Sequence, residues 1–216
     1  MGGSDVARQG WRWLWSALAC LVLVGVTIAW LDRPIARFVH AQFPDKNVFD
    51  WMQRLPEWLT TAAALVLLGL IVAWALGRRV RGPCEVLARA SLSLAAAVLM
   101  KDQLKFLFGR TWPETWVNKN PSYISDGVFG FFPLHGGVGW AAFPSGHMTA
   151  ITSVLAVLWL RWPALRWLYA LLWLDVVVGL LGADYHWLSD IVAGSFLGAA
   201  VGAVAARLGS GDQRTS

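Results

Sequence analysis

The stretch that decides the fold class is Leu59 to Leu76, LTTAAALVLLGLIVAWAL, in which no residue is charged. A helix that spans a bilayer needs about 20 mostly apolar residues, so this run comes close to a full span by itself. Comparable runs recur along the 216 residues of the chain. We therefore predict an all-α, polytopic membrane protein with about six transmembrane helices in a bundle.

The other predicted spans cover about residues 13–31, 86–108, 147–160, 165–182 and 187–208. The first of them, preceded by Arg8 and Arg12, can be interpreted as a signal peptide or as a retained helix. The residues behind it form a poor cleavage site, which favours the retained helix. We expect one membrane-embedded domain over residues 1–216, with the functional motifs in residues 101–194.

Composition supports this class and argues against others. Hydrophobic residues make up 57% of the chain and charged residues 14%, against about 25% charged residues in a soluble domain. A disordered chain is excluded, and a soluble globular enzyme is disfavoured. The net charge of +5 does not indicate a nucleic-acid partner, because the basic residues form short clusters between apolar runs rather than one basic face.

The distribution of Lys and Arg predicts the orientation. With the N-terminus inside, the inner segments hold ten of the 18 Lys and Arg residues and three acidic residues. The outer segments hold the other eight Lys and Arg residues and nine acidic residues. An excess of positive charge marks the cytoplasmic side, so we expect both termini to be cytoplasmic. The compact chain favours a bacterial inner membrane.

Reactive and charged side chains gather at one predicted membrane level, at the outer ends of the spans. They are Lys101, Lys105 and Arg110 at the outer end of the third span, Ser145, Gly146 and His147 at the start of the fourth, and Asp184, His186 and Asp190 where the fifth span ends and the sixth begins. Two histidines, carboxylates, a hydroxyl and several cations suit phosphoryl transfer through a histidine.

Local spacing gives these groups roles, each with an alternative. Residues 144–147, PSGH, open a helix whose free N–H groups favour an anion; the alternative is a serine N-cap beside an interfacial histidine. His186 and Asp190 are four apart, so the carboxylate can bond one imidazole nitrogen and leave the other as a nucleophile; the alternative is a pair on the helix surface. Lys101 and Lys105 share a helical face and either bind an anion or extend to the headgroups.

Four further polar residues receive simpler interpretations. Asp175 lies in mid-span, where a protonated carboxyl bonded to a neighbouring helix is favoured over a functional one. Asp184 is expected to cap the sixth helix. His40 and His135 show no partner pattern, and we expect both in loops.

The sequences FPSGH at 143–147 and HWLSD at 186–190 resemble two motifs of the type-2 phosphatidic acid phosphatase and haloperoxidase superfamily. Its membrane members have six spans, with motifs of the forms K-x6-R-P, P-S-G-H and S-R-x5-H-x3-D on the outer face. The resemblance covers about residues 101–194. It implies that His186 forms a phosphohistidine, that Asp190 orients it, and that His147 acts as general acid.

The same resemblance implies that Ser145, the Gly146 N–H and Lys105 hold the phosphoryl oxygens, without a metal ion or other cofactor. The first motif is incomplete, because Trp112 occupies its arginine position between Lys105 and Pro113. In the third motif, Gly179 and Leu180 occupy the Ser-Arg positions. We expect Arg110 and Lys101 to bind phosphate oxygens in place of the missing arginines.

The sequence therefore predicts an integral membrane phosphatase that hydrolyses a lipid phosphate or diphosphate at the outer, periplasmic face. Phosphatidic acid, phosphatidylglycerol phosphate, an isoprenyl diphosphate and a lipid A phosphate all fit as the partner. Two alternatives remain open. One is a lipid phosphotransferase with the same site; the other, which the missing arginines support, is a non-catalytic phospholipid-binding homologue. The oligomeric state is not predicted.

Overall fold

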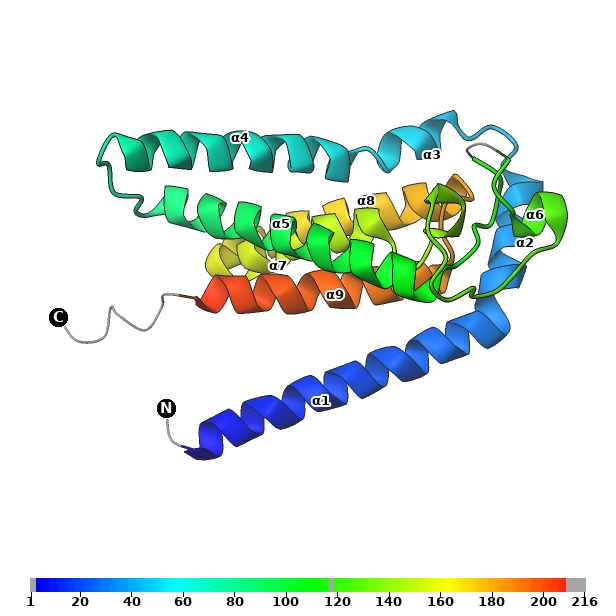
Figure 1. Ribbon diagram of the computed structural model, residues 1–216, viewed down its shortest axis with the longest axis horizontal. Helices are drawn as coiled ribbons and strands as arrows, with labels where there is room; N and C mark the ends of the chain where they lie inside the picture. The colour runs from blue at the N-terminus through cyan, green and yellow to red at the C-terminus, as the bar shows by residue number, and fades with distance from the viewer. Residues whose placement is uncertain (1–2, 117–118, 209–216) are drawn as a thin grey trace.

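The computed structural model describes residues 3–116 and 119–208 of the chain. Its α-helices are α1 (Gly3–Val26), α2 (Asp32–Gln42), α3 (Asn47–Met52), α4 (Leu55–Ala75), α5 (Pro83–Phe108), α6 (Tyr123–Asp126), α7 (Gly146–Arg161), α8 (Arg166–Gly182) and α9 (Leu188–Arg207). Turns of π- or 3₁₀-helix lie at Thr27–Leu31, Val138–Trp140 and Pro163–Leu165. The long helices run along one axis, with α2 and α6 at one end and both chain ends at the other (Figure 1).

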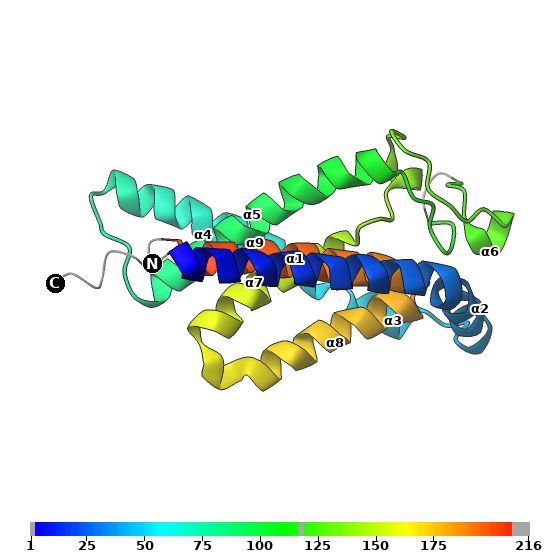
Figure 2. The same ribbon diagram turned by 90° about the horizontal axis from the view of Figure 1, so that it is seen from below.

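The predicted all-α membrane bundle is confirmed. Among the described residues, five helical segments are long and apolar enough to cross a membrane: Arg8–Gln42, Asn47–Ala75, Pro83–Phe108, Pro163–Gly182 and Leu188–Arg207. The fourth predicted span corresponds to α7, which has 16 residues and is shorter than a full span. Half of its residues are buried, because α5, α8 and α9 pack around it. The helix α1 contacts the bundle through α9, and Figure 2 shows the two running along the same axis.

Three glycines on α9 bring α7 and α9 into close contact. A Cβ atom on Gly194, Gly198 or Gly202 would lie 2.5 Å or less from a backbone oxygen of α7 or of its N-cap residue Ser145. Glycines four residues apart form one stripe along a helix, which lets two backbones approach closely in a membrane. This contact sets the start of α7 against the start of α9.

The segment between the first two predicted spans forms α2 and α3. A π-helical turn precedes α2, and the Thr27 hydroxyl donates to the carbonyls of Leu23 and Val24 at 2.9 Å. The turn ends at Asp32, whose side chain is buried. The chain thereby carries a carboxylate from the N-terminal helix toward the end of the bundle where α6 lies.

Candidate active site

His186 lies in the short connection between α8 and α9, directly before the N-cap residue Trp187. Its Nδ1 is 3.2 Å from Oδ2 of Asp190, and both side chains are buried. The same oxygen accepts the backbone N–H of Trp187 at 3.1 Å, which fixes the carboxylate at the start of α9. An N–H on Nδ1 that donates to Asp190 leaves the lone pair of Nε2 available to attack.

Burial lowers the pKa of His186 from its ordinary value of 6.5, because a charged imidazolium loses its hydration there. The hydrogen bond and negative charge of Asp190 oppose this shift, whereas the positive charges of Lys105 and Arg110 add to it. His186 is therefore neutral over the physiological pH range, which is the state that a nucleophile requires.

His147 faces His186 from the first turn of α7. The centroids of the two rings are 6.3 Å apart, and the ring of Tyr185 lies 5.5 Å from that of His147. Oε1 of Glu57, in the first turn of α4, is 3.9 Å from Nε2 of His147. The two imidazoles therefore lie close enough together to contact one phosphoryl group.

The two histidines open onto a pocket of about 290 Å³. It is lined by Pro56, Glu57, Thr60, Val98, Lys101, Lys105, Trp112, Gly146, His147, Ala150, Tyr185 and His186. Its lining residues include the last turns of α5 and the first turn of α7, and Figure 1 shows that α5 ends toward α6. Lys101 and Lys105 supply positive charge to the α5 wall, as the spacing of four predicts.

Gly146 begins α7 beside the two lysines. A Cβ atom on Gly146 would lie 3.2 Å from Cδ and Cε of Lys101 and 3.6 Å from Nζ of Lys105. The glycine therefore lets both lysines approach the N-terminus of α7, where backbone N–H groups favour an anion. Lys101 also pairs with Asp102, and Nζ of Lys105 lies 5.7 Å from the centroid of the Trp112 ring.

The structure places Arg110 behind the pocket rather than in it. Nη1 donates to Asp190 at 2.5 Å and Nη2 donates to Asp32 at 2.7 Å, and the residue is 0% exposed. Its guanidinium is enclosed by the rings of Phe129, Phe131, Phe143 and Trp187. This corrects the expectation that Arg110 faces the phosphate, because two buried carboxylates hold the guanidinium on the far side of Asp190.

Asp32 completes this network and is a site residue that the sequence did not reveal. Its Oδ1 accepts the Ser189 backbone N–H at 3.0 Å, and its Oδ2 accepts both the Ser189 hydroxyl and Arg110. Asp32 and Ser189 are 157 positions apart, so no local spacing signals the contact. The result is a buried series, His186–Asp190–Arg110–Asp32, in which the three charged groups alternate in sign.

Ser145 acts as the N-cap of α7. Its Oγ accepts the Met148 N–H at 3.4 Å, and its own N–H donates to the carbonyl oxygen of Asp190 at 3.0 Å. The side chain is buried and is not among the described residues that line the pocket. Ser145 thus links α7 to α9, as the N-cap alternative implies, and its contact with phosphate stays a prediction.

Uncharged side chains fill the two positions where the family motifs have arginine. Trp112 is buried, its ring lies 5.0 Å from that of His186, and its Nε1 donates to the Val138 carbonyl at 2.8 Å. Leu180 is buried in the core, and its carbonyl accepts the His186 N–H at 3.3 Å. Phosphate in this pocket would therefore meet Lys101 and Lys105 rather than a guanidinium from these positions.

Glu57 and Tyr185 also line the pocket without having been expected there. Burial raises the pKa of Tyr185, and the negative charge of Glu57 adds to the shift, so the phenol stays protonated. Glu57 lies just before an apolar run, at the predicted outer level. His147 has the same kind of position, at the outer start of the fourth predicted span. Tyr185 adjoins His186 in the sequence, but nothing local indicates the direction of its ring.

The sequence led us to expect that Asp184 caps α9, but Trp187 occupies the N-cap position. Instead, Asp184 has a φ of +54° and pairs with Nδ1 of His40 at 3.0 Å and with Nζ of Lys46 at 2.8 Å. His40 lies in α2 rather than in a loop. Asp175 lies in the middle of α8 and does not line the pocket.

Comparison with known proteins shows the family of the chain and a similar fold. The family model described as the PAP2 superfamily matches residues 86–213, more than half of the chain. The fold is similar to that of the structure described as the first transmembrane PAP2 type phosphatidylglycerolphosphate phosphatase from Bacillus subtilis, with 16% identity and a TM-score of 0.62. That match covers 92% of this chain and 98% of the other. No curated protein sequence matches the chain. The chain is an integral membrane protein that belongs to the PAP2 superfamily.

Proposed function

We propose that the protein hydrolyses the phosphate or diphosphate of a membrane lipid, with His186 as nucleophile. The observation that carries this proposal is the pair of imidazoles, His186 and His147, whose rings are 6.3 Å apart at a pocket lined by two lysines. Asp190 at Nδ1 gives His186 a defined tautomer. A protein that only binds phospholipid has no need of a carboxylate behind a buried histidine.

In the first step, Nε2 of His186 attacks phosphorus while the bond from phosphorus to the lipid oxygen breaks. His147 donates a proton to that oxygen, so the lipid leaves as an alcohol or as a monophosphate. Burial and the neighbouring His186, Lys105 and Lys101 lower the pKa of His147 to about 3. In our proposal the negative charge of the bound phosphate, with Glu57 3.9 Å away, opposes this shift and favours the protonated form that the step uses. The product on the protein is a phosphohistidine.

In the second step, a water molecule attacks phosphorus and His147 accepts its proton. The phosphorus–nitrogen bond breaks, inorganic phosphate leaves, and His186 returns to its neutral form. His147 thus acts as general acid in the first step and as general base in the second, because the second step resembles the reverse of the first with water in place of the lipid. The two steps consume one water and release one phosphate for each lipid.

Lys101, Lys105 and the N-terminus of α7 stabilise the phosphoryl oxygens as charge develops on them. These groups carry positive charge or N–H dipoles. In our proposal they provide the electrostatic stabilisation that a metal ion would otherwise supply, and they disfavour cation binding. Gly146 allows the approach of the lysines to the helix end. Two ammonium groups supply charge without the planar fork of an arginine, so orientation of the phosphoryl group depends more on the two histidines.

Arg110 and Asp32 act as positioning residues in this proposal, because neither lines the pocket. Arg110 holds Asp190 from behind, and Asp32 neutralises the positive charge that Arg110 brings. Without Asp32, Arg110 would interact more strongly with Asp190, and the hydrogen bond between Asp190 and His186 would weaken. The buried series therefore sets how strongly Asp190 orients the nucleophile.

A lipid substrate follows from the surroundings of the pocket. Helix α4 contributes Pro56, Glu57 and Thr60 to the pocket wall, and only 6% of the apolar window of its segment is buried. A headgroup in the pocket would therefore leave its hydrocarbon chains against the lipid-facing side of α4. We place the pocket on the periplasmic side of the membrane, because the inner segments carry the excess of positive charge.

The test uses purified protein in micelles of a non-ionic detergent. Phosphatidic acid, phosphatidylglycerol phosphate, an isoprenyl diphosphate and a lipid A phosphate are supplied in turn, and released inorganic phosphate is measured. We expect turnover of at least one lipid, loss of turnover in His186→Ala, and normal turnover in the control His135→Ala, which alters an exposed loop histidine.

Acid quenching during turnover of a ³²P-labelled lipid adds a direct readout. An acid-labile label on the wild-type protein, absent from His186→Ala, supports the phosphohistidine. Transfer of the label to another lipid without release of phosphate would identify a phosphotransferase instead. Binding of every lipid without turnover or labelling would overturn the catalytic proposal in favour of a phospholipid-binding homologue.

A further inference from the structure

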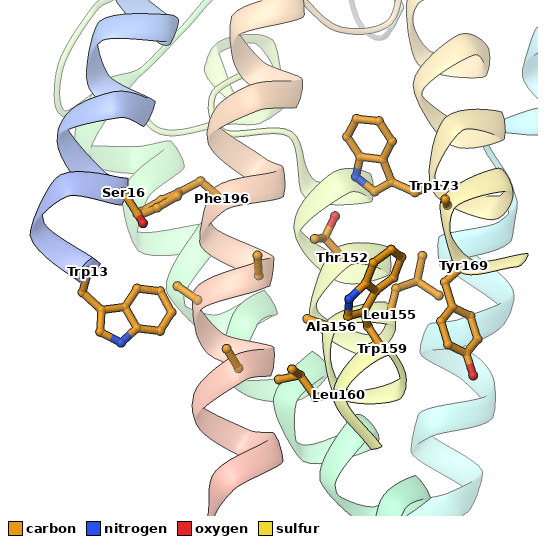
Figure 3. A pocket seen from close by; sticks show the side chains of 14 residues that line it. Trp13, Ser16, Thr152, Leu155, Ala156, Trp159, Leu160, Tyr169, Trp173 and Phe196 are labelled. Atoms are coloured by element: carbon orange, nitrogen blue, oxygen red, sulfur yellow. The ribbon is translucent and has the colours of Figure 1, made fainter. Parts of the chain in front are cut away.

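A second cavity lies far from His186, toward the end of the bundle that holds the chain termini. It has a volume of about 540 Å³ and lies between α1, α7, α8 and α9. Figure 3 shows Trp13 and Ser16 of α1 on one side, Phe196 of α9 next to them, and Trp159 and Trp173 on the other side. We call this space the apolar cavity; its volume falls in the range that encloses small-molecule ligands.

Small residues on α9 create the space. Ala199, Ala200 and Ala203 of α9 and Ala156 of α7 line the apolar cavity, and their small side chains leave space between the larger ones. At the same level, Gly202 of α9 packs directly against Ser153 and Ala156 of α7. The apolar cavity therefore lies beside the close contact between α7 and α9.

Two hydroxyl groups in the apolar cavity lack a hydrogen-bond partner among the described residues. They are the phenol of Tyr169, a residue that is 4% exposed, and Oγ1 of Thr152. A buried polar group without a partner is costly, and most such groups in proteins are satisfied. Tyr169 lies in the first turn of α8, close to the expected membrane surface. Both oxygens are enclosed by neighbouring side chains, so these hydroxyl groups mark incomplete polar packing beside the apolar cavity.

Arginine side chains border the neighbouring space, which we call the arginine cavity. It measures about 520 Å³ and is lined by Arg8, Gln9, Arg12, Trp13, Ser16, Leu160, Ala203 and Arg207. The described residues of this lining include no Asp or Glu. Trp13, Ser16, Leu160 and Ala203 line both cavities, so the apolar and cationic spaces adjoin.

We propose that the two cavities together bind one anionic phospholipid. Its phosphate lies among Arg8, Arg12 and Arg207, and one acyl chain enters the apolar cavity. Basic pockets between membrane helices on the cytoplasmic side bind anionic headgroups, and juxtamembrane arginines strengthen that attraction. The lipid joins α1 to α7, α8 and α9, and it is not the substrate of the site at His186.

The α4–α5 turn offers a comparison within the same chain. Arg78, Arg79 and Arg81 border a cavity of about 440 Å³ at the same end of the bundle. None of the described residues of that lining carries a buried hydroxyl without a partner. Net charge alone would make the two arginine groups equal, whereas a defined lipid site distinguishes them.

The experiment measures lipid retention by native mass spectrometry of the purified protein in detergent. Phosphatidylglycerol and phosphatidylcholine with identical acyl chains are added at equal concentration, and phosphatidylglycerol, a phosphodiester, is not a substrate under our proposed function. We expect wild type to retain phosphatidylglycerol at least tenfold better than phosphatidylcholine. The triple variant Arg8→Gln, Arg12→Gln, Arg207→Gln should lose that preference, and the matched triple Arg78→Gln, Arg79→Gln, Arg81→Gln should keep it.

A variant that leaves all arginines in place tests the acyl-chain cavity. Ala200→Phe fills the space and should lower phosphatidylglycerol retention several-fold, while the control Ala64→Phe, on an exposed position of α4, should not. Equal loss in both arginine triples would overturn the proposal in favour of diffuse surface attraction. Unchanged retention in Ala200→Phe, or a dimer that forms in wild type and dissociates in that variant, would also overturn it.

Discussion

The two ends of the bundle both collect arginine side chains, but they hold them in opposite ways. Arg110 is 0% exposed and lies between the carboxylates of Asp32 and Asp190, whereas Arg12 and Arg207 are exposed beside an apolar cavity. A charge that is buried without counter-charges is strongly unfavourable, so Arg110 requires both carboxylates. The comparison teaches that the partners of an arginine, rather than its presence near a site, decide whether it builds the protein or binds a ligand.

Removal of the buried arginine should have the largest effect. Arg110→Met leaves Asp32 and Asp190 without their common partner, and loss of one member of a buried ion pair costs about 3–5 kcal/mol of unfolding free energy. Arg207→Met at the other end should change that free energy by less than about 0.5 kcal/mol. Denaturant unfolding in mixed micelles measures both variants. Similar losses in the two variants would contradict the contrast between the two ends.

A cation that faces the pocket should affect catalysis rather than stability. Lys105→Gln removes a charge-assisted contact to the phosphoryl oxygens, which is worth about 1.5–3 kcal/mol, or roughly a 10- to 150-fold decrease in kcat/KM. Arg54→Gln removes an exposed cation near the start of α4 and should keep the wild-type rate. Steady-state kinetics on one lipid substrate decides. Wild-type kinetics in Lys105→Gln would exclude this lysine as a phosphate ligand.

Asp32→Asn should have a smaller effect that separates positioning from folding. Arg110 then retains one counter-charge and draws on Asp190 more strongly, so we expect kcat to fall about tenfold while KM changes little. Removal of this negative charge also disfavours the protonated form of His186, so the acid limb of the pH profile should move to lower pH. Asp175→Asn, in the middle of α8, should leave both unchanged.

A double variant shows whether Asp32 acts through Asp190. If it does, Asp32→Asn should have little further effect on kcat in an Asp190→Asn background, because the group that it positions is already neutral. Size-exclusion profiles establish that each variant is folded. A fall in kcat for Asp32→Asn with no change in the pH profile, and full additivity with Asp190→Asn, would assign Asp32 a structural role alone.

The smallest expected effect is in the wild-type pH dependence. Burial lowers the pKa of His186 below its ordinary value of 6.5, so the imidazole stays neutral as the pH falls toward that value. After correction for titration of the substrate and of His147, kcat/KM should therefore show no acid limb from His186 between pH 7.5 and 6.5, a change of less than about twofold. An acid limb centred at or above pH 6.5 would show that the nucleophile is not shielded as the structure implies.

The groups that sequence spacing placed correctly are those joined by local geometry. His186 and Asp190 lie four residues apart at a helix start, and Lys101 and Lys105 lie one turn apart on α5, so both pairs form wherever those helices form. Gly146 was predicted to let a ligand approach the backbone, and it is close to both lysines. Such contacts depend on few residues and on the regular geometry of one helix.

The direction of Arg110 and the role of Asp32 could not be predicted in this way. Arg110 follows Gly109, which has a φ of +56° and whose Cβ would lie 1.8 Å from the Phe132 carbonyl oxygen. That glycine turns the chain out of α5, and the side chain that follows meets whichever counter-charges the fold supplies. The sequence shows an arginine five residues after Lys105, but it does not show that Asp32 lies near Asp190 and pairs with that arginine.

By itself, the sequence determined the membrane class, the approximate helix limits and the histidine motifs, because hydropathy and helical periodicity are properties of contiguous residues. Only the tertiary structure decided that Arg110 is paired inside the protein, that Glu57 faces His147, and that alanines leave a cavity beside Arg12 and Arg207. These features join helices far apart in the chain. Their energies depend on burial and on the distances between charges, and both are set only when the helices pack together.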